Sequence, residues 1–309
     1  MSFQSVVAGM FLRWRVKNGT KPMKLDYQDA RERVNRISAM GPGVPSDITH
    51  TPIAADPNKG LCAAEWLSAP NPQRTVVYFH GGGYFFCSLE THRAACGYLA
   101  RKSQARVLSV DYRMAPEHAC PAAVEDAVAW WQELLNQGVN PQEVVFAGDS
   151  AGGGLVLACL VAARDRGLPM PAGALLFSPW ADLSCSGETM KSQAKADVMF
   201  NPYLLPQAAE LYLQGRPNTD PLASPLFANL TGLPEMLIFA SEHEILLSDS
   251  TRLYDKARQA GIPVQLLKRP RMPHVWPILI LLPEAREDMS KSGQFIARVT
   301  GQPSQAKAA

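Results

Sequence analysis

The sequence predicts an α/β fold in which a mostly parallel sheet is covered by helices on both faces. Short runs of β-branched and apolar residues alternate with helical patterns over residues 75–267. Such alternation is typical of βαβ units, whose strands run parallel. The run Val-Val-Phe-Ala at 144–147 is apolar at every position, as expected of a strand buried on both faces. A chain of 309 residues, 47% of them hydrophobic, can bury one large core.

Two helices and an edge hairpin are expected before the main sheet. Apolar residues at helical spacing from Phe3 to Trp14 predict an amphipathic helix. We expect it to dock on the rest of the protein rather than on a membrane, because its polar face carries few cations. A second helix is predicted over 26–40, before a Gly- and Pro-rich boundary at 41–45. Residues 48–67 predict a hairpin at a sheet edge.

The remaining elements divide the chain into a core and a cap. Strands are predicted at 75–79, 107–110, 144–147, 172–177, 236–240 and 264–267, and helices at 90–104, 124–138 and 250–260. The strand pattern disappears over 185–216, where a Pro-broken helical pattern predicts an insertion above the sheet. We therefore predict a small helical cap from 1–45 and 185–216, an α/β core from 46–184 and 217–300, and a disordered tail at 301–309.

A G-x-S-x-G sequence lies between the strand at 144–147 and the helical pattern that follows it. The residues are Gly148-Asp149-Ser150-Ala151-Gly152, and small neighbours let the backbone turn sharply enough to expose the serine hydroxyl. Ser150 is therefore the candidate nucleophile, and we expect Asp149 to support the turn. The motif alone is weak evidence, because Gly, Ser and Ala are common residues.

Other residues supply the groups that a serine nucleophile needs. Acyl transfer requires a base, an acid that orients the base, and donors for an oxyanion. His80-Gly81-Gly82-Gly83 follows the strand at 75–79, which would place backbone donors at the same sheet edge as Ser150. His274 lies just beyond the last predicted strand and is the candidate base. His92 is expected to lie far from that edge.

The candidate acid lies on the loop after the strand at 236–240. Glu242, Glu244 and Asp249 all compete for the role, since each preserves the chain order Ser, acid, His. The residues alone leave these three alternatives open.

Several motifs together resemble one family. The chain contains the sequences HGGG at 80–83, DYRMAPE at 111–117, GDSAGG at 148–153, SPW at 178–180, DPLASP at 220–225 and HVW at 274–276. This combination resembles the bacterial hormone-sensitive-lipase-like esterases. The resemblance implies an α/β-hydrolase fold, carboxylesterase activity, and no metal or organic cofactor. It also implies an oxyanion hole formed by the amides of Gly82, Gly83 and Ala151.

The resemblance also favours one of the three acids. In such enzymes the acid, most commonly an Asp, precedes by two residues the position that Leu246 occupies here. That alignment places Glu244 in the catalytic position, ahead of Asp249 and Glu242. A glutamate is chemically adequate, because the acid need only accept the imidazole N–H and stabilise the imidazolium.

The predicted substrate is a small ester. Bulky residues near the motifs and in the cap are expected to line its pocket, namely Tyr84, Phe85, Phe200, Tyr203, Leu247 and Trp276. A compact cap rich in aromatic residues predicts short or medium acyl chains, up to roughly eight carbons. Two alternatives stay open: an amidase or deacetylase with the same triad, and a non-catalytic ligand-binding protein of the same fold.

The composition of the chain indicates which classes of partner and which cellular compartment to expect. The formal net charge is +2 and no block of Lys or Arg occurs, which argues against a nucleic-acid partner or a stable membrane association. The six cysteines form no C-x-x-C pair, which favours reduced thiols without a zinc site. The N-terminal stretch lacks the pattern of a secretory signal, so a cytoplasmic setting is expected. A homodimer is left open.

Overall fold

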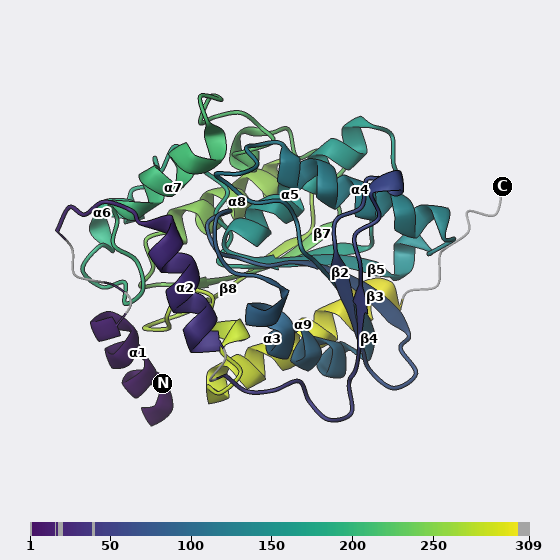
Figure 1. The fold of residues 1–309 in the computed structure, drawn as a ribbon, viewed down its shortest axis with the longest axis horizontal. Helices are drawn as coiled ribbons and strands as arrows, with labels where there is room; N and C mark the ends of the chain where they lie inside the picture. The colour runs from purple at the N-terminus through teal and green to yellow at the C-terminus, as the bar shows by residue number, and fades with distance from the viewer. Residues whose placement is uncertain (1, 16, 18–20, 39–40, 302–309) are drawn as a thin grey trace.

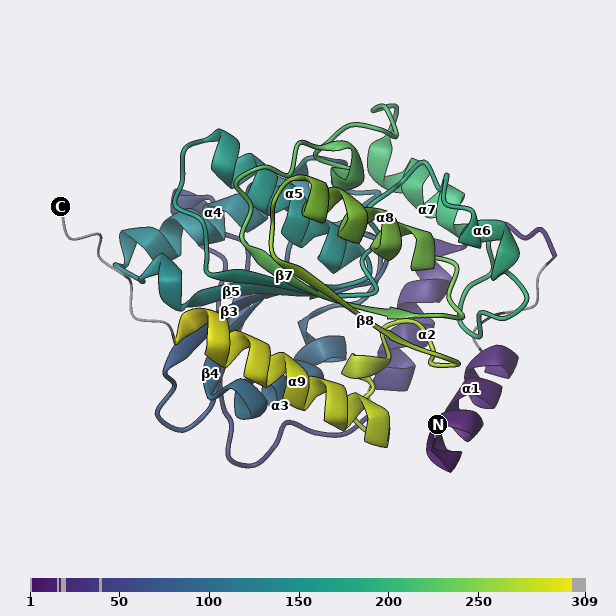
Figure 2. The same cartoon turned by 180° about the vertical axis from the view of Figure 1, so that it is seen from behind.

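The protein contains one eight-stranded sheet flanked by helices on both faces (Figures 1 and 2). The computed structural model describes residues 2–15, 17, 21–38 and 41–301. The strand order is β1-β2-β4-β3-β5-β6-β7-β8. The β1–β2 and β2–β4 pairs are antiparallel and all other neighbours are parallel. The predicted α/β class, with its mostly parallel sheet and edge hairpin, is confirmed.

The strands agree with the apolar runs of the sequence to within about two residues. Their bounds are β1 Thr49–Ile53, β2 Ala64–Ser68, β3 Arg74–Phe79, β4 Ala105–Val110, β5 Val144–Asp149, β6 Gly173–Phe177, β7 Glu235–Ser241 and β8 Val264–Arg269. Strands β5 and β6 are buried at every position, because helices cover both of their faces.

Two layers of helices enclose the sheet, as Figure 2 shows. Helices α3 and α9 cover one face, and α4, α5 and α8 cover the other. The helix bounds are α1 Phe3–Arg15, α2 Tyr27–Ser38, α3 Leu89–Ser103, α4 Ala122–Asn136, α5 Ala151–Asp165, α6 Thr189–Ser192, α7 Leu204–Leu213, α8 Leu247–Gln259 and α9 Pro283–Thr300. Each layer buries its own apolar cluster against the sheet. Helix α9 was not predicted as a separate element.

The two segments that were predicted to form the cap contact each other. The Gln207 side chain accepts a hydrogen bond from the amide of Leu25 (2.8 Å) and donates one to the carbonyl of Met23 (2.9 Å). The Asn201 amide donates to the carbonyl of Lys21 at 2.9 Å. The division into core and cap stays a prediction, and the proposed tail, apart from Gly301, lies outside the described residues.

Helix α1 does not bury the stripe that was expected to dock. Its side chains Phe3, Val7, Met10, Phe11 and Trp14 are all exposed, by 47–80%. The helix is attached instead through small residues: the Ser2 and Ser5 hydroxyls donate to Glu284 of α9 at 2.8 and 2.7 Å. The prediction that the apolar face docks on the protein is therefore wrong.

Candidate active site

Ser150 lies at the turn between β5 and α5. Its backbone adopts φ 51° and ψ −121°, a conformation that a non-glycine residue adopts only where its surroundings impose it. The Ser150 amide donates to the carbonyl of Phe177 (2.9 Å), and its carbonyl accepts from the amide of Trp180 (2.8 Å). A Cβ atom at Gly152 would lie 2.0 Å from the carbonyl oxygen of Phe79. Glycine is therefore required for α5 to approach β3 this closely.

His274 and Glu244 form a buried pair. The His274 Nδ1 lies 2.6 Å from Glu244 Oε2, and the two side chains are 2% and 0% exposed. The other carboxylate oxygen of Glu244 accepts the Ser241 amide at 3.0 Å. The buried Nε2 of His274 has no hydrogen-bond partner among the described residues. This nitrogen is therefore available to a hydroxyl proton, while Nδ1 is held by the carboxylate.

The other two acids occupy different environments. The buried Asp249 carboxylate accepts the amides of Ala181 and Asp182, both at 2.9 Å. Burial, reinforced by the Asp182 carboxylate, raises the pKa of Asp249 to about 8. The backbone amide of Glu242 donates to the carbonyl of Arg269 at 2.9 Å. Within the part of the chain that the structure describes, Glu244 is the carboxylate that pairs with His274.

The glycine loop after β3 approaches the Ser150 turn. Gly82 and Gly83 adopt φ values of 107° and 59°, which glycine reaches without steric cost. A Cβ atom at Gly82 would lie 2.0 Å from the carbonyl oxygen of Phe86. No acceptor for the Gly82, Gly83 or Ala151 amide is found in the described ranges. Their role as an oxyanion hole stays a prediction.

Asp149 connects the glycine loop to the Ser150 turn. Its Oδ1 accepts the Gly81 amide at 3.0 Å and the Tyr78 hydroxyl at 2.8 Å, so it supports the turn as predicted. His92 was expected to lie far away, yet its Nε2 is 3.4 Å from Asp149 Oδ2. That expectation is wrong, because α3 places the His92 ring beside His80, with ring centroids 5.6 Å apart. Burial lowers the pKa of the adjacent His80 to about 4.

Three predicted pocket residues lie near these groups. The Phe200 ring lies against His274, with ring centroids 4.6 Å apart. Tyr84 is fully buried and stacks on Tyr212 of α7 at a centroid distance of 3.9 Å. The Phe85 ring is buried and lies next to Gly83. Phe200 is the one whose ring directly contacts a candidate catalytic side chain.

The other three predicted pocket residues lie in different environments. Tyr203 is 47% exposed at the start of α7, and Leu247 is half-buried three residues after Glu244. Their roles stay predictions. Trp276 is fully buried, its Nε1 donates to Asp288 at 2.9 Å, and its ring packs on Phe239. The pocket assignment is wrong for Trp276, because the side chain belongs to the core under α9.

Asp197 is a site residue that sequence reasoning missed. Its side chain is 1% exposed and accepts the amides of Met199 (2.7 Å) and Phe200 (2.9 Å) on one oxygen. The other oxygen accepts the amide of Ile245 at 2.9 Å. Asp197 therefore connects the segment that carries Phe200 to the loop that carries Glu244. An aspartate in a polar, Pro-broken stretch carries no sequence signal for such a role.

Replacing Asp197 with asparagine is expected to lower kcat roughly tenfold to a hundredfold, because small displacements of catalytic groups have effects of that size. The asparagine keeps one acceptor oxygen and turns an NH₂ toward an amide donor. A matched control is Asp182→Asn, since buried Asp182 also accepts backbone amides, those of Ser184 and Ser186. Thermal unfolding and ester turnover measure both variants, and equal kcat losses at equal stability would contradict the role of Asp197.

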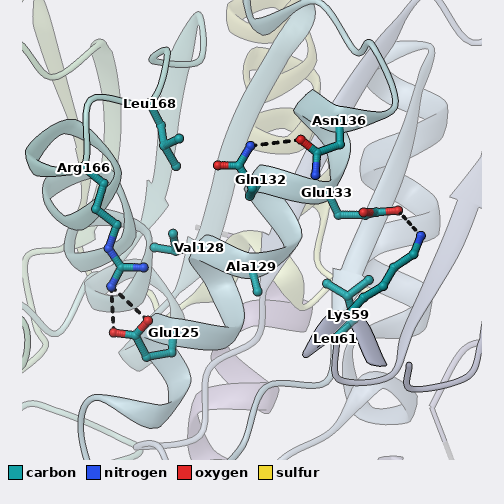
Figure 3. A pocket seen from close by; sticks show the side chains of 10 residues that line it. All are labelled: Lys59, Leu61, Glu125, Val128, Ala129, Gln132, Glu133, Asn136, Arg166 and Leu168. Atoms are coloured by element: carbon teal, nitrogen blue, oxygen red, sulfur yellow. Dashed lines mark hydrogen bonds and ion pairs between the residues drawn. The ribbon is translucent and has the colours of Figure 1, made fainter. Parts of the chain in front are cut away.

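A separate surface pocket lies on the α4 side of the molecule (Figure 3). It has a volume of ≈ 610 Å³ and is crossed by the ion pairs Lys59–Glu133 and Arg166–Glu125. Its lining consists of Lys59, Leu61, Glu125, Val128, Ala129, Gln132, Glu133, Asn136, Arg166 and Leu168. None of these residues belongs to the loops around Ser150, so this pocket is distinct from the candidate site. In the described residues no cluster of His, Cys, Asp or Glu is arranged to hold a metal.

Comparisons with known proteins agree with this fold. A family model described as an α/β-hydrolase fold matches residues 76–278. An acetyl-hydrolase of Streptomyces hygroscopicus is 40% identical over 297 residues, which cover 94% of each chain. The crystal structure of an esterase/lipase from an uncultured bacterium is 40% identical, with a TM-score of 0.90 over 98% of this chain and 100% of that one.

A second solved structure indicates the group of α/β hydrolases to which the chain is similar. An esterase of the bacterial hormone-sensitive lipase family is 36% identical, with a TM-score of 0.90 over 97% of this chain and 99% of that one. The chain therefore belongs to the α/β-hydrolase family, among the bacterial hormone-sensitive-lipase-like esterases.

Proposed function

We propose that the protein is a serine carboxylesterase that works through an acyl-enzyme intermediate. The observation that carries the proposal is the buried His274–Glu244 pair, whose Nε2 is left without a partner among the described residues. The strained turn at Ser150 supplies the nucleophile. Relatives that act as esterases and an acetyl-hydrolase support the same class of reaction.

The proposed reaction has two steps with the same groups. His274 takes the Ser150 hydroxyl proton as the oxygen attacks the ester carbonyl, and the amides of Gly82, Gly83 and Ala151 stabilise the oxyanion. His274 then returns the proton to the leaving alcohol. In the second step His274 deprotonates water, which attacks the acyl-enzyme, and His274 returns that proton to the Ser150 oxygen as the bond to the acyl group breaks and the acid is released. Glu244 holds the imidazole orientation and stabilises the imidazolium throughout.

Short or medium acyl chains are the expected substrates, up to roughly eight carbons. The Phe200 ring contacts His274, and the Tyr84 ring stacks on Tyr212 of α7. Such bulky rings near the candidate base favour a short slot. Turnover of a series of p-nitrophenyl esters of increasing chain length measures the preference. Faster hydrolysis of emulsified long-chain triglyceride than of soluble butyrate esters would contradict it.

The two alternative functions can be distinguished from an esterase by the substrates that the protein hydrolyses. An amidase or deacetylase would use the same triad, and a panel of matched esters and amides separates it from an esterase. A ligand-binding protein of this fold would neither turn over a p-nitrophenyl ester nor react with a fluorophosphonate. The His274–Glu244 contact favours catalysis over binding alone.

The proposed cellular compartment rests on the cysteines. All six cysteines are free thiols, and burial raises the pKa of Cys62 and of Cys185 to about 12. These thiols fit a reducing compartment such as the cytoplasm. No helix in the described residues is long and apolar enough to cross a membrane. Sedimentation velocity would determine whether the protein is a monomer or a homodimer.

A further inference from the structure

Helix α1 presents a continuous apolar face to solvent. Phe3, Met10 and Trp14 are 80%, 68% and 71% exposed, and Val7 and Phe11 lie between them on the same face. Exposed apolar residues that stand alone are ordinary, but a contiguous patch of this kind usually marks a contact surface. In Figures 1 and 2 the helix lies at the edge of the molecule, outside the two layers that cover the sheet.

The attachment of α1 leaves that face open. Arg13 donates to the carbonyl of Ala196 (3.1 Å), and the buried Lys17 ammonium donates to the carbonyl of Ala194 (2.6 Å). Ser5, on another side of the helix, donates to Glu284. The helix is therefore held to the protein through polar groups and small residues.

The segment around this face is cationic. The first 25 residues contain no Asp or Glu and five basic residues, Arg13, Arg15, Lys17, Lys21 and Lys24. Lys21 and Lys24 are exposed. Lys195 is also exposed, and it lies between Ala194 and Ala196, the two residues that α1 contacts. The helix by itself has few cations, but its flank and the adjoining segment add to them.

We propose that the apolar face of α1 adsorbs reversibly to an anionic lipid surface. An amphipathic helix with aromatic residues on one face and cations beside it lies in the plane of a bilayer interface without crossing it. Exposed cations near such a helix are attracted to anionic headgroups. A second copy of the chain fits less well, because a symmetric contact would bring two cationic, carboxylate-free segments together.

Vesicle binding of the full chain tests this proposal. Partitioning into vesicles of phosphatidylcholine mixed with phosphatidylglycerol is expected to be on the order of tenfold stronger than into phosphatidylcholine alone. High salt should weaken it by screening the cations. The double variant Phe3→Gln with Met10→Gln should lose binding by about tenfold or more, because two exposed apolar side chains are removed.

A matched variant controls for a general loss of surface hydrophobicity. Phe227 is 38% exposed in the short helix Pro225–Phe227, and Phe227→Gln should leave vesicle binding unchanged. Circular dichroism and p-nitrophenyl butyrate turnover should be the same for all three proteins. Equal partitioning of the double variant, or salt-independent binding to both kinds of vesicle, would overturn the proposal. So would a dimer that dissociates in the double variant, since a second copy would then occupy the face.

Discussion

Ser150→Ala is expected to lower kcat for p-nitrophenyl butyrate about a millionfold, as when the nucleophile of a serine triad is lost. The hydroxyl is small, and its removal leaves the amide and carbonyl bonds of Ser150 to Phe177 and Trp180 in place. The free energy of unfolding should therefore change little. Steady-state turnover and thermal unfolding of the variant measure the two effects separately.

Ser109→Ala is a matched control for this substitution. Ser109 is a buried serine on β4, and loss of its hydroxyl should leave kcat nearly unchanged. A fluorophosphonate should label the wild type and Ser109→Ala but not Ser150→Ala. Residual turnover of Ser150→Ala within tenfold of wild type, with the label still attached, would identify a different nucleophile.

Glu244→Gln is expected to lower kcat by about four orders of magnitude. The glutamine side chain can present its NH₂ to His274 Nδ1, which would favour the imidazole tautomer that carries its proton on Nε2. That tautomer cannot accept the Ser150 proton. Measurement of kcat and of thermal unfolding for the folded variant shows whether the loss is chemical or structural.

Asp249→Asn provides the comparison, because Asp249 was the rival acid. The Asp249 carboxyl group accepts two backbone amides, and its pKa is raised to about 8, so burial favours its neutral form. Asparagine resembles that neutral form and keeps a carbonyl acceptor. We expect kcat within tenfold of wild type. A larger loss of kcat for Asp249→Asn than for Glu244→Gln, with both variants folded, would reverse the assignment.

Local sequence patterns predicted most of the sheet, because buried parallel strands are apolar on both faces. The run at 144–147 appears as β5 Val144–Asp149, and the one at 172–177 as β6 Gly173–Phe177. Helix α9 was missed although its apolar residues Ala285, Met289, Phe295 and Ile296 recur at helical spacing. Polar Asp288 and Ser292 lie on the same buried face, so apolar residues alone do not mark that face.

Site residues could be predicted where a motif needs particular residues for its backbone conformation. They could not be predicted where side-chain packing in the folded protein determines the contacts. Gly82 and Ser150 lie in turns that only particular residues tolerate, so their positions are visible in the sequence. The competition between Glu244 and Asp249 depends on which carboxylate reaches His274, which is a property of the folded loop. Trp276 and Asp197 were misjudged or missed for the same reason. A tryptophan suits a pocket and a core equally well, and an aspartate reveals none of its partners.

The hydrogen bond from the Gly81 amide to Asp149 connects the glycine loop to the Ser150 turn through two adjacent strands. Strands β3 and β5 pair directly, so Phe79 lies opposite Gly148 in their register. In the proposed reaction, the position of the Ser150 turn relative to the glycine loop is therefore set by the sheet. Changes among the predicted cap residues other than Asp197 and Phe200 would therefore alter the proposed acyl or alcohol pocket while that relative position persists. A scaffold of this kind can diversify its substrates without rebuilding its chemistry.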